Sequence, residues 1–122
     1  MNICCMMENL IGKYLLDIQE GILHIENFTE GIDSFFDYEK NLLVKRAVER
    51  ELEIIGEAMN RILKLDNDIN IANTRQITGV RNRVIHGYDK VDDAIIWGIL
   101  IKHLPKLKDQ VETLIHSIQE EE

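Results

Sequence analysis

The stretch LIGKYLLDIQEGILHI, residues 10–25, decides the fold class. Its apolar residues recur at steps of three and four, the spacing that places side chains on one stripe of an amphipathic helix. A helix of this kind must bury its stripe against other elements, so the rest of the chain has to supply partners. The stripe consists of Leu10, Ile11, Tyr14, Leu15, Ile18, Ile22 and Ile25.

A second helix is expected from Ser34 to about Leu65. Ser34, with Asp37 three residues later, is typical of an N-cap followed by an acidic first turn. At this length it is the longest predicted element. Its apolar positions are Phe35, Leu42, Leu43, Ala47, Leu52, Ile55, Met59 and Ile62.

A third helix is expected from Thr74 to about His86. It follows a segment rich in Asn and Asp, which are common turn residues. Asn73 and Gln76 resemble a capping box at its start, and Gly87 suits the left-handed residue that often follows a helix.

The C-terminal part predicts one or two further helices. Asp92 is expected to cap the first of them. Pro105 either kinks that helix or opens a fifth at its first position, where a missing amide hydrogen costs little. The apolar positions of this part are Ala94, Ile95, Trp97, Ile99, Leu100, Leu107, Val111, Leu114, Ile115 and Ile118.

Together these patterns predict an all-α protein, an antiparallel up-and-down bundle of four to five helices. A chain of 122 residues with a single proline has room for one core but not for two. We expect residues 1–6 to be a disordered leader, residues 7–118 to be one helical domain, and residues 119–122 to be an acidic tail.

Charge and composition exclude several classes of function. The net charge of −8 argues against DNA binding and against any nucleic-acid binding by bulk charge, so a contact with RNA has to be local. The longest apolar run, residues 94–101, is far shorter than the roughly 20 residues of a membrane span. Without a secretion signal, a cytoplasmic location is expected.

No cofactor or metal site is predicted. Cys4 and Cys5 are adjacent and cannot easily meet ordinary disulfide geometry. Four glutamates of the second helix have no histidine at metal-ligand spacing and predict a solvated face. These glutamates are Glu49, Glu51, Glu53 and Glu57. Three histidines are likewise expected to lie on helix surfaces, namely His24, His103 and His116.

The candidate site is a stretch of sixteen positions, residues 75–90, that gathers cations in an otherwise acidic chain. Arginine offers phosphate a permanent planar cation, and histidine can take and give a proton near neutral pH. These groups suit cleavage of RNA, in which the 2′-hydroxyl attacks the neighbouring phosphorus, and that scheme requires no metal. The residues are Arg75, Arg81, Asn82, Arg83, His86, Tyr88 and Lys90.

Helix geometry limits how these groups can converge. Asn82 and His86, four residues apart, share a face of a regular helix, whereas Arg81 and His86 lie about 140° apart around it. Either the helix ends near His86 and redirects its side chain, or a second copy of the chain supplies the complementary groups across a two-fold axis. We favour the homodimer.

The sequence Arg-Asn-Arg-Val-Ile-His-Gly-Tyr, residues 81–88, resembles the signature of the HEPN superfamily, and specifically of its HepT-like branch. In that branch an arginine, four intervening residues, a histidine, one residue and a tyrosine occur in this order. The resemblance extends over about residues 9–117. It includes residues 50–58, residues 75–80, Val91 and Asp92, Trp97, and residues 104–108.

The resemblance implies a dimeric, metal-independent ribonuclease toxin that is encoded beside a minimal nucleotidyltransferase antitoxin. Carried over by position, Arg81 and His86 are the catalytic residues, and Asn82 is a supporting polar residue. Tyr88 is the acceptor of AMP groups from the antitoxin. Arg75, Arg83 and Lys90 are expected to contact RNA.

An alternative from another class remains open, in which the bundle only binds a nucleotide or a partner protein and cleaves nothing. The neighbouring reading frame distinguishes the two hypotheses, since a short nucleotidyltransferase there favours the toxin.

Overall fold

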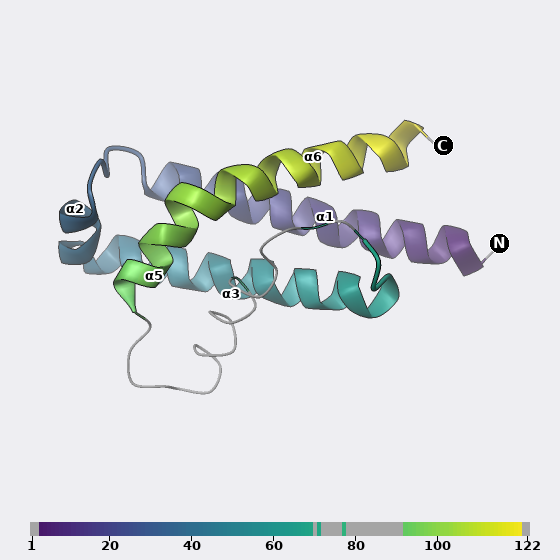
Figure 1. Cartoon of the computed structure of the whole chain (residues 1–122), viewed down its shortest axis with the longest axis horizontal. Helices are drawn as coiled ribbons and strands as arrows, with labels where there is room; N and C mark the ends of the chain where they lie inside the picture. Colours follow the sequence, from purple (N-terminus) through teal and green to yellow (C-terminus); the bar gives the residue numbers. More distant parts are fainter. Residues whose placement is uncertain (1–2, 70, 72–76, 78–91, 121–122) are drawn as a thin grey trace.

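The computed structural model describes residues 3–69, 71, 77 and 92–120. Within these ranges it contains no strand, which confirms the all-α class. α1 runs antiparallel to α3 and α6, and it packs against both (Figure 1). The elements are α1 (Ile3–Phe28), α2 (Phe35–Lys40), α3 (Leu42–Leu65), α5 (Asp93–Gly98), the π-helical turn η1 (Ile99–His103) and α6 (Leu104–Glu120).

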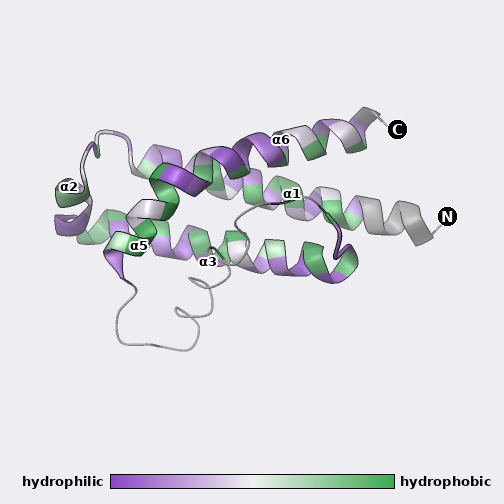
Figure 2. Ribbon diagram, viewed as in Figure 1, coloured by the Kyte–Doolittle hydropathy of each residue, from purple (hydrophilic) through white to green (hydrophobic). Residues whose placement is uncertain are grey.

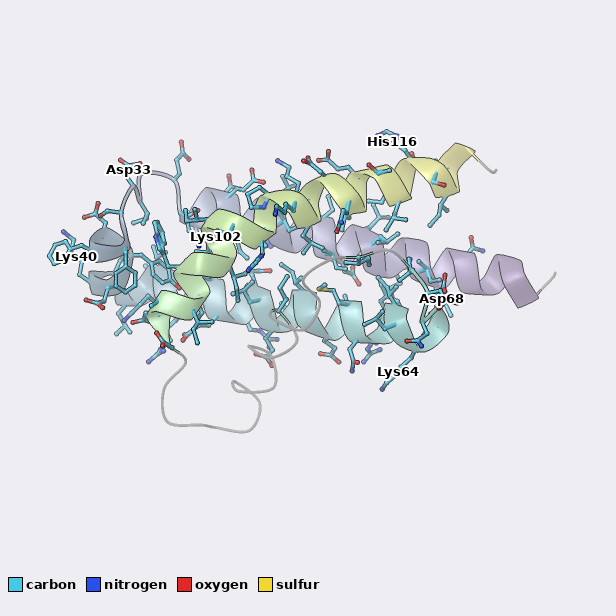
Figure 3. The ribbon with its side chains drawn as sticks, viewed as in Figure 1. Asp33, Lys40, Lys64, Asp68, Lys102 and His116 are labelled. Atoms are coloured by element: carbon cyan, nitrogen blue, oxygen red, sulfur yellow. The ribbon has the colours of Figure 1, made fainter. Side chains whose placement is uncertain are left out.

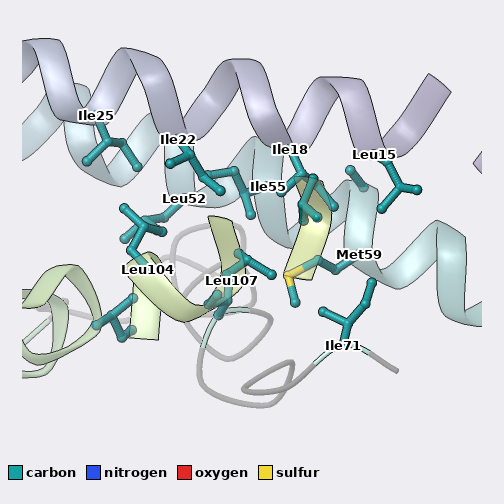
Figure 4. Close-up of a cluster of buried hydrophobic side chains, with 14 of the residues drawn as sticks. Leu15, Ile18, Ile22, Ile25, Leu52, Ile55, Met59, Ile71, Leu104 and Leu107 are labelled. Atoms are coloured by element: carbon teal, nitrogen blue, oxygen red, sulfur yellow. The ribbon is translucent and has the colours of Figure 1, made fainter. Parts of the chain in front are cut away.

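The core is built around the predicted stripe of α1. From Ile11 onward its aliphatic members are buried, and they face α3 on one side and α6 on the other (Figure 4). Leu10 is 43% exposed, so the prediction was wrong at that position. Hydrophobic and hydrophilic residues alternate around the helices (Figure 2). The facing residues include Leu52, Ile55 and Met59 of α3 and Leu104, Leu107 and Val111 of α6.

A glycine sets the distance between α1 and α3. Gly21 is buried, and a Cβ atom at this position would lie 2.8 Å from Cγ1 of Ile55. Real Cβ atoms essentially never lie this close to a non-bonded atom. A larger residue would therefore have to push the two helices apart or displace Ile55.

The predicted continuous helix from Ser34 to Leu65 is wrong at Asn41. There the backbone leaves the helical region, with φ −100° and ψ 91°. The side-chain oxygen of Asn41 accepts the N–H of Val44 at 3.1 Å and so caps α3. Short polar side chains compete in this way with helix continuation. Ser34 caps α2 as predicted, accepting the N–H of Asp37 at 3.2 Å.

The break at Asn41 changes which side chains enter the core. Tyr38 is fully buried, although the sequence pattern had not singled it out. Leu42 and Leu43, predicted as core residues, are 59% and 81% exposed. Across the break the three-and-four spacing no longer describes one continuous surface.

Asp92 caps α5 as predicted, since its carboxylate accepts the N–H of Ala94 at 2.9 Å. The two alternatives for Pro105 are combined in the structure. The helix continues from α5 through η1, where the N–H of Leu104 donates to the carbonyl of Ile99 five residues earlier. Pro105 then lies in the first turn of α6, where its missing N–H is tolerated. Ile96, rather than Ile95, is the buried member of α5.

The ends of the chain differ from the sequence-based boundaries. α1 begins at Ile3, so the helix includes residues 3–6, which were expected to form a leader. α6 continues to Glu120, two residues into the predicted tail. The predicted helix 74–86 and its caps Asn73 and Gly87 lie outside the described residues, except for Ile77, which is helical. No helix in the described part is both long and apolar enough to cross a membrane.

Candidate functional site

The predicted site residues lie outside the part of the chain that the structure describes. They are Arg75, Arg81, Asn82, Arg83, His86, Tyr88 and Lys90. The structure does describe the residues that hold this stretch at both ends. Ile71 and Ile77 anchor its N-terminal side, because both are buried in the core. On the C-terminal side the chain enters α5 at Asp92.

An ion pair fixes the start of α5 to the start of α3. Nζ of Lys45 lies 2.9 Å from Oδ2 of Asp93, although the two residues are 48 positions apart in the sequence. Their side chains are only 17% and 24% exposed. Hydrogen bonds between charged groups are stronger than neutral ones, and shielding from water reduces screening by salt.

A ring contact holds α5 from a second direction. The rings of Tyr38 in α2 and Trp97 in α5 lie 5.5 Å apart between centroids, with an angle of 32° between their planes. The hydroxyl of Tyr38 is buried and has no hydrogen-bond partner in the described part of the chain. Burial raises the pKa of Tyr38, and the nearby carboxylates of Glu49 and Asp93 raise it further. The hydroxyl therefore stays protonated at physiological pH.

The prediction of a solvated glutamate face is wrong for most of its members. Glu49 is 8% exposed, and both of its carboxylate oxygens accept from Nη1 of Arg46, at 2.9 and 3.3 Å. Glu51 is largely buried, and its Oε1 lies 3.1 Å from Nδ1 of His24. Glu53 is likewise shielded and pairs with Arg50, whereas Glu57 is the more exposed partner of Arg61. In the described residues, no three His, Cys, Asp or Glu side chains are arranged to hold a metal ion.

The three histidines outside the candidate stretch occupy different environments. His116 lies on the exposed surface of α6, as predicted (Figure 3). His24 is half-buried, and its ring also lies 6.2 Å from that of Phe28. His103 is half-buried, and its Nδ1 has no partner among the described residues.

A hollow of about 330 Å³ lies between the C-terminal part of α1 and the η1–α6 segment. Its lining is mostly aliphatic, with Ile22, Ile25 and Leu104 among the contributors. At its rim Lys108 pairs with Glu26 at 2.9 Å, and this contact raises the pKa of Lys108. The described lining contains no histidine that could act as the general base of RNA cleavage.

Comparison with known proteins identifies a family for this architecture. The family model described as "Ribonuclease HepT-like" matches residues 18–114. A protein of Methanocaldococcus jannaschii named "Putative RNase MJ1380" is 35% identical over 104 residues, covering 84% of this chain and 94% of the relative. The "Probable ribonuclease HepT" of Thermococcus cleftensis is 37% identical over 105 residues, covering 83% and 92%. No solved structure matches the chain significantly.

Proposed function

The chain belongs to the HepT-like ribonuclease family, and we propose that it is a metal-independent endoribonuclease in which Arg81 and His86 carry the reaction. The observation that carries the proposal is the family match over residues 18–114, which includes the whole stretch 75–90. That stretch concentrates arginines and a histidine in a chain of net charge −8. Such a concentration of arginine in the sequence favours binding of phosphate.

The proposed reaction is a transesterification within the RNA chain. His86 removes the proton of a 2′-hydroxyl, and the resulting oxygen attacks the adjacent phosphorus. The bond from phosphorus to the 5′-oxygen of the next nucleotide breaks, and that oxygen receives a proton from the imidazolium. Arg81 donates hydrogen bonds to the non-bridging oxygens as their charge increases. The products are a 2′,3′-cyclic phosphate and a 5′-hydroxyl.

The remaining residues of the stretch have supporting roles in this proposal. Asn82 donates its amide to the same phosphate or to the neighbouring ribose. Arg75, Arg83 and Lys90 neutralise flanking phosphates, which positions the RNA without reading its sequence.

The test is incubation of RNA with the purified protein in excess EDTA. We expect cleavage with 2′,3′-cyclic phosphate ends, identified by mass spectrometry of the fragments. Cleavage that EDTA abolishes, or fragments with 3′-hydroxyl ends, would contradict the mechanism. RNA or nucleotide binding without any cleavage would favour the alternative of a binding module.

We further propose that the protein is the toxin of a toxin–antitoxin pair. Its partner is a nucleotidyltransferase that attaches AMP to the hydroxyl of Tyr88. Each adduct brings negative charge next to the site and repels the RNA backbone.

We also propose that the active form is a homodimer with residues 81–88 of both chains in one cleft. The distribution of apolar surface supports an interface near the start of α5. α2 contacts both α3 and α5 at this end of the bundle (Figure 1). Phe36, Leu42, Leu43 and Ile95 are exposed there, and apolar surface of this kind favours association.

Leu43→Glu is expected to convert the dimer into a monomer, because it places a charge in the proposed apolar interface. Leu23→Glu is the matched control, since Leu23 is an exposed leucine of α1, a helix that contributes no residue to the proposed interface. Analytical ultracentrifugation at micromolar concentration should give twice the 14.2 kDa chain mass for the wild type and the control, and one chain mass for Leu43→Glu. A monomeric wild type would exclude the dimer, and a dimeric Leu43→Glu would exclude this interface.

A further inference from the structure

We propose that the ion pair between Lys45 and Asp93 positions the ribonuclease site by fixing the start of α5 against α3. Neither side chain is assigned a contact with RNA. The inference rests on the proposed function, because it takes residues 81–88 as the site. What it adds is a pair of positioning residues outside the cation-rich stretch.

The ion pair between Lys45 and Asp93 is well shielded from water. Lys40–Asp37, Arg50–Glu53 and Arg61–Glu57 each join residues of one helix, and their cations are more than half exposed. Surface pairs of this kind contribute little to structure. Lys45–Asp93 instead joins two helices, with both side chains less than a quarter exposed. Among the Lys and Arg ion pairs of the described residues, it is the best shielded from water.

Asp93 lies in the first turn of α5, at the N-terminal end of the helix that continues through η1 into α6. Helix ends fray because their terminal backbone groups lack partners within the helix. The orientation of this first turn therefore depends on contacts with other elements. Asp93 supplies the ion pair to α3, and Trp97, one turn later, supplies the ring contact to Tyr38 of α2. Losing Lys45 leaves Asp93 shielded without its cation, which destabilises this arrangement.

The proposed site and the start of α5 are also close along the chain. Tyr88 precedes Asp92 by four residues and His86 precedes it by six, so covalent geometry limits their Cα distances to about 14 and 22 Å. A shift of the first turn of α5 therefore moves the point to which the C-terminal end of residues 81–88 is covalently connected. Displacement of a catalytic group by about 1 Å can lower a rate by about 10²-fold.

The test compares Lys45→Met with Lys108→Met as the matched control. Lys108 also forms a pair of 2.9 Å between two helices, with Glu26 of α1, but it lies on α6. We expect Lys45→Met to lower kcat by about tenfold while KM for RNA changes less than threefold, which is the pattern for misplaced catalytic groups. The control should keep the wild-type kcat. The charge swap Lys45→Asp with Asp93→Lys should recover a large part of the kcat that Lys45→Met loses.

Amide hydrogen exchange tests whether the ion pair stabilises α5, and it requires no measurement of RNA cleavage. Lys45→Met is expected to increase exchange of the α5 amides, residues 94–98, while those of α1 stay protected. Unchanged protection of α5 in Lys45→Met would overturn this proposal, whether or not the wild type cleaves RNA. A wild type that cleaves no RNA would instead contradict the proposed function. A rise in KM with constant kcat would also overturn it, because it would mean that Lys45 binds RNA directly.

Discussion

Alanine at His86 is expected to lower the rate of RNA cleavage by about 10²-fold or more, because the 2′-hydroxyl then loses its general base. Arg81→Ala should cause a loss of similar size through a different cause, the missing stabilisation of charge on the phosphate oxygens. The measurement is the cleavage rate of a short RNA under single-turnover conditions in EDTA. Such conditions separate the chemical step from product release.

His116→Ala is the matched control for the histidine variant, because His116 is an exposed histidine of α6. It should cleave RNA at the wild-type rate. Wild-type cleavage by either His86→Ala or Arg81→Ala would exclude that residue from the reaction.

Phenylalanine at Tyr88 is expected to abolish neutralisation of the protein by covalent modification. The substitution keeps the ring but removes the oxygen that accepts AMP. After incubation with the nucleotidyltransferase, ATP and a divalent metal, mass spectrometry should detect AMP on the wild type and none on Tyr88→Phe. RNA cleavage should then be blocked only in the wild type.

Tyr14→Phe provides the control, since Tyr14 is a half-buried tyrosine of α1. This variant should still be modified and silenced. AMP found on another residue, or full silencing of Tyr88→Phe by a catalytically active antitoxin, would show that Tyr88 is not the acceptor.

The sequence predicted the α1 stripe because one helix with regular spacing needs no information from elsewhere in the chain. Ile11, Leu15, Ile18, Ile22 and Ile25 are buried as expected. The helix caps at Ser34 and Asp92 were predictable for the same reason, since each acts within three residues.

The break at Asn41 was not predictable in this way. Asparagine is tolerated inside helices and also caps them, so its residue type alone does not decide between the two. Next to the break, the ring of Tyr38 is buried against Trp97, 59 positions later in the sequence. Such a contact leaves no periodic signal.

For the candidate site too, local features were predictable from the sequence and long-range contacts were not. The sequence singled out Arg81 to Tyr88 as a local motif, and that assignment stays a prediction. The ion pair between Lys45 and Asp93 was not predicted, because the two residues are 48 positions apart in the sequence. The shielding of Glu49 and Glu53 was missed as well, although an arginine three residues before each is a local signal that could have suggested it.

The position of α1 between α3 and α6 has a consequence for synthesis of the protein. α1 and α3 are complete once residue 65 has been made, and their packing can form early because they are close in sequence. Leu104, Leu107 and Val111 of α6 join the same core only at the end of translation. A nascent or truncated chain that stops before residue 104 therefore contains every predicted catalytic residue but lacks the helix that closes the core.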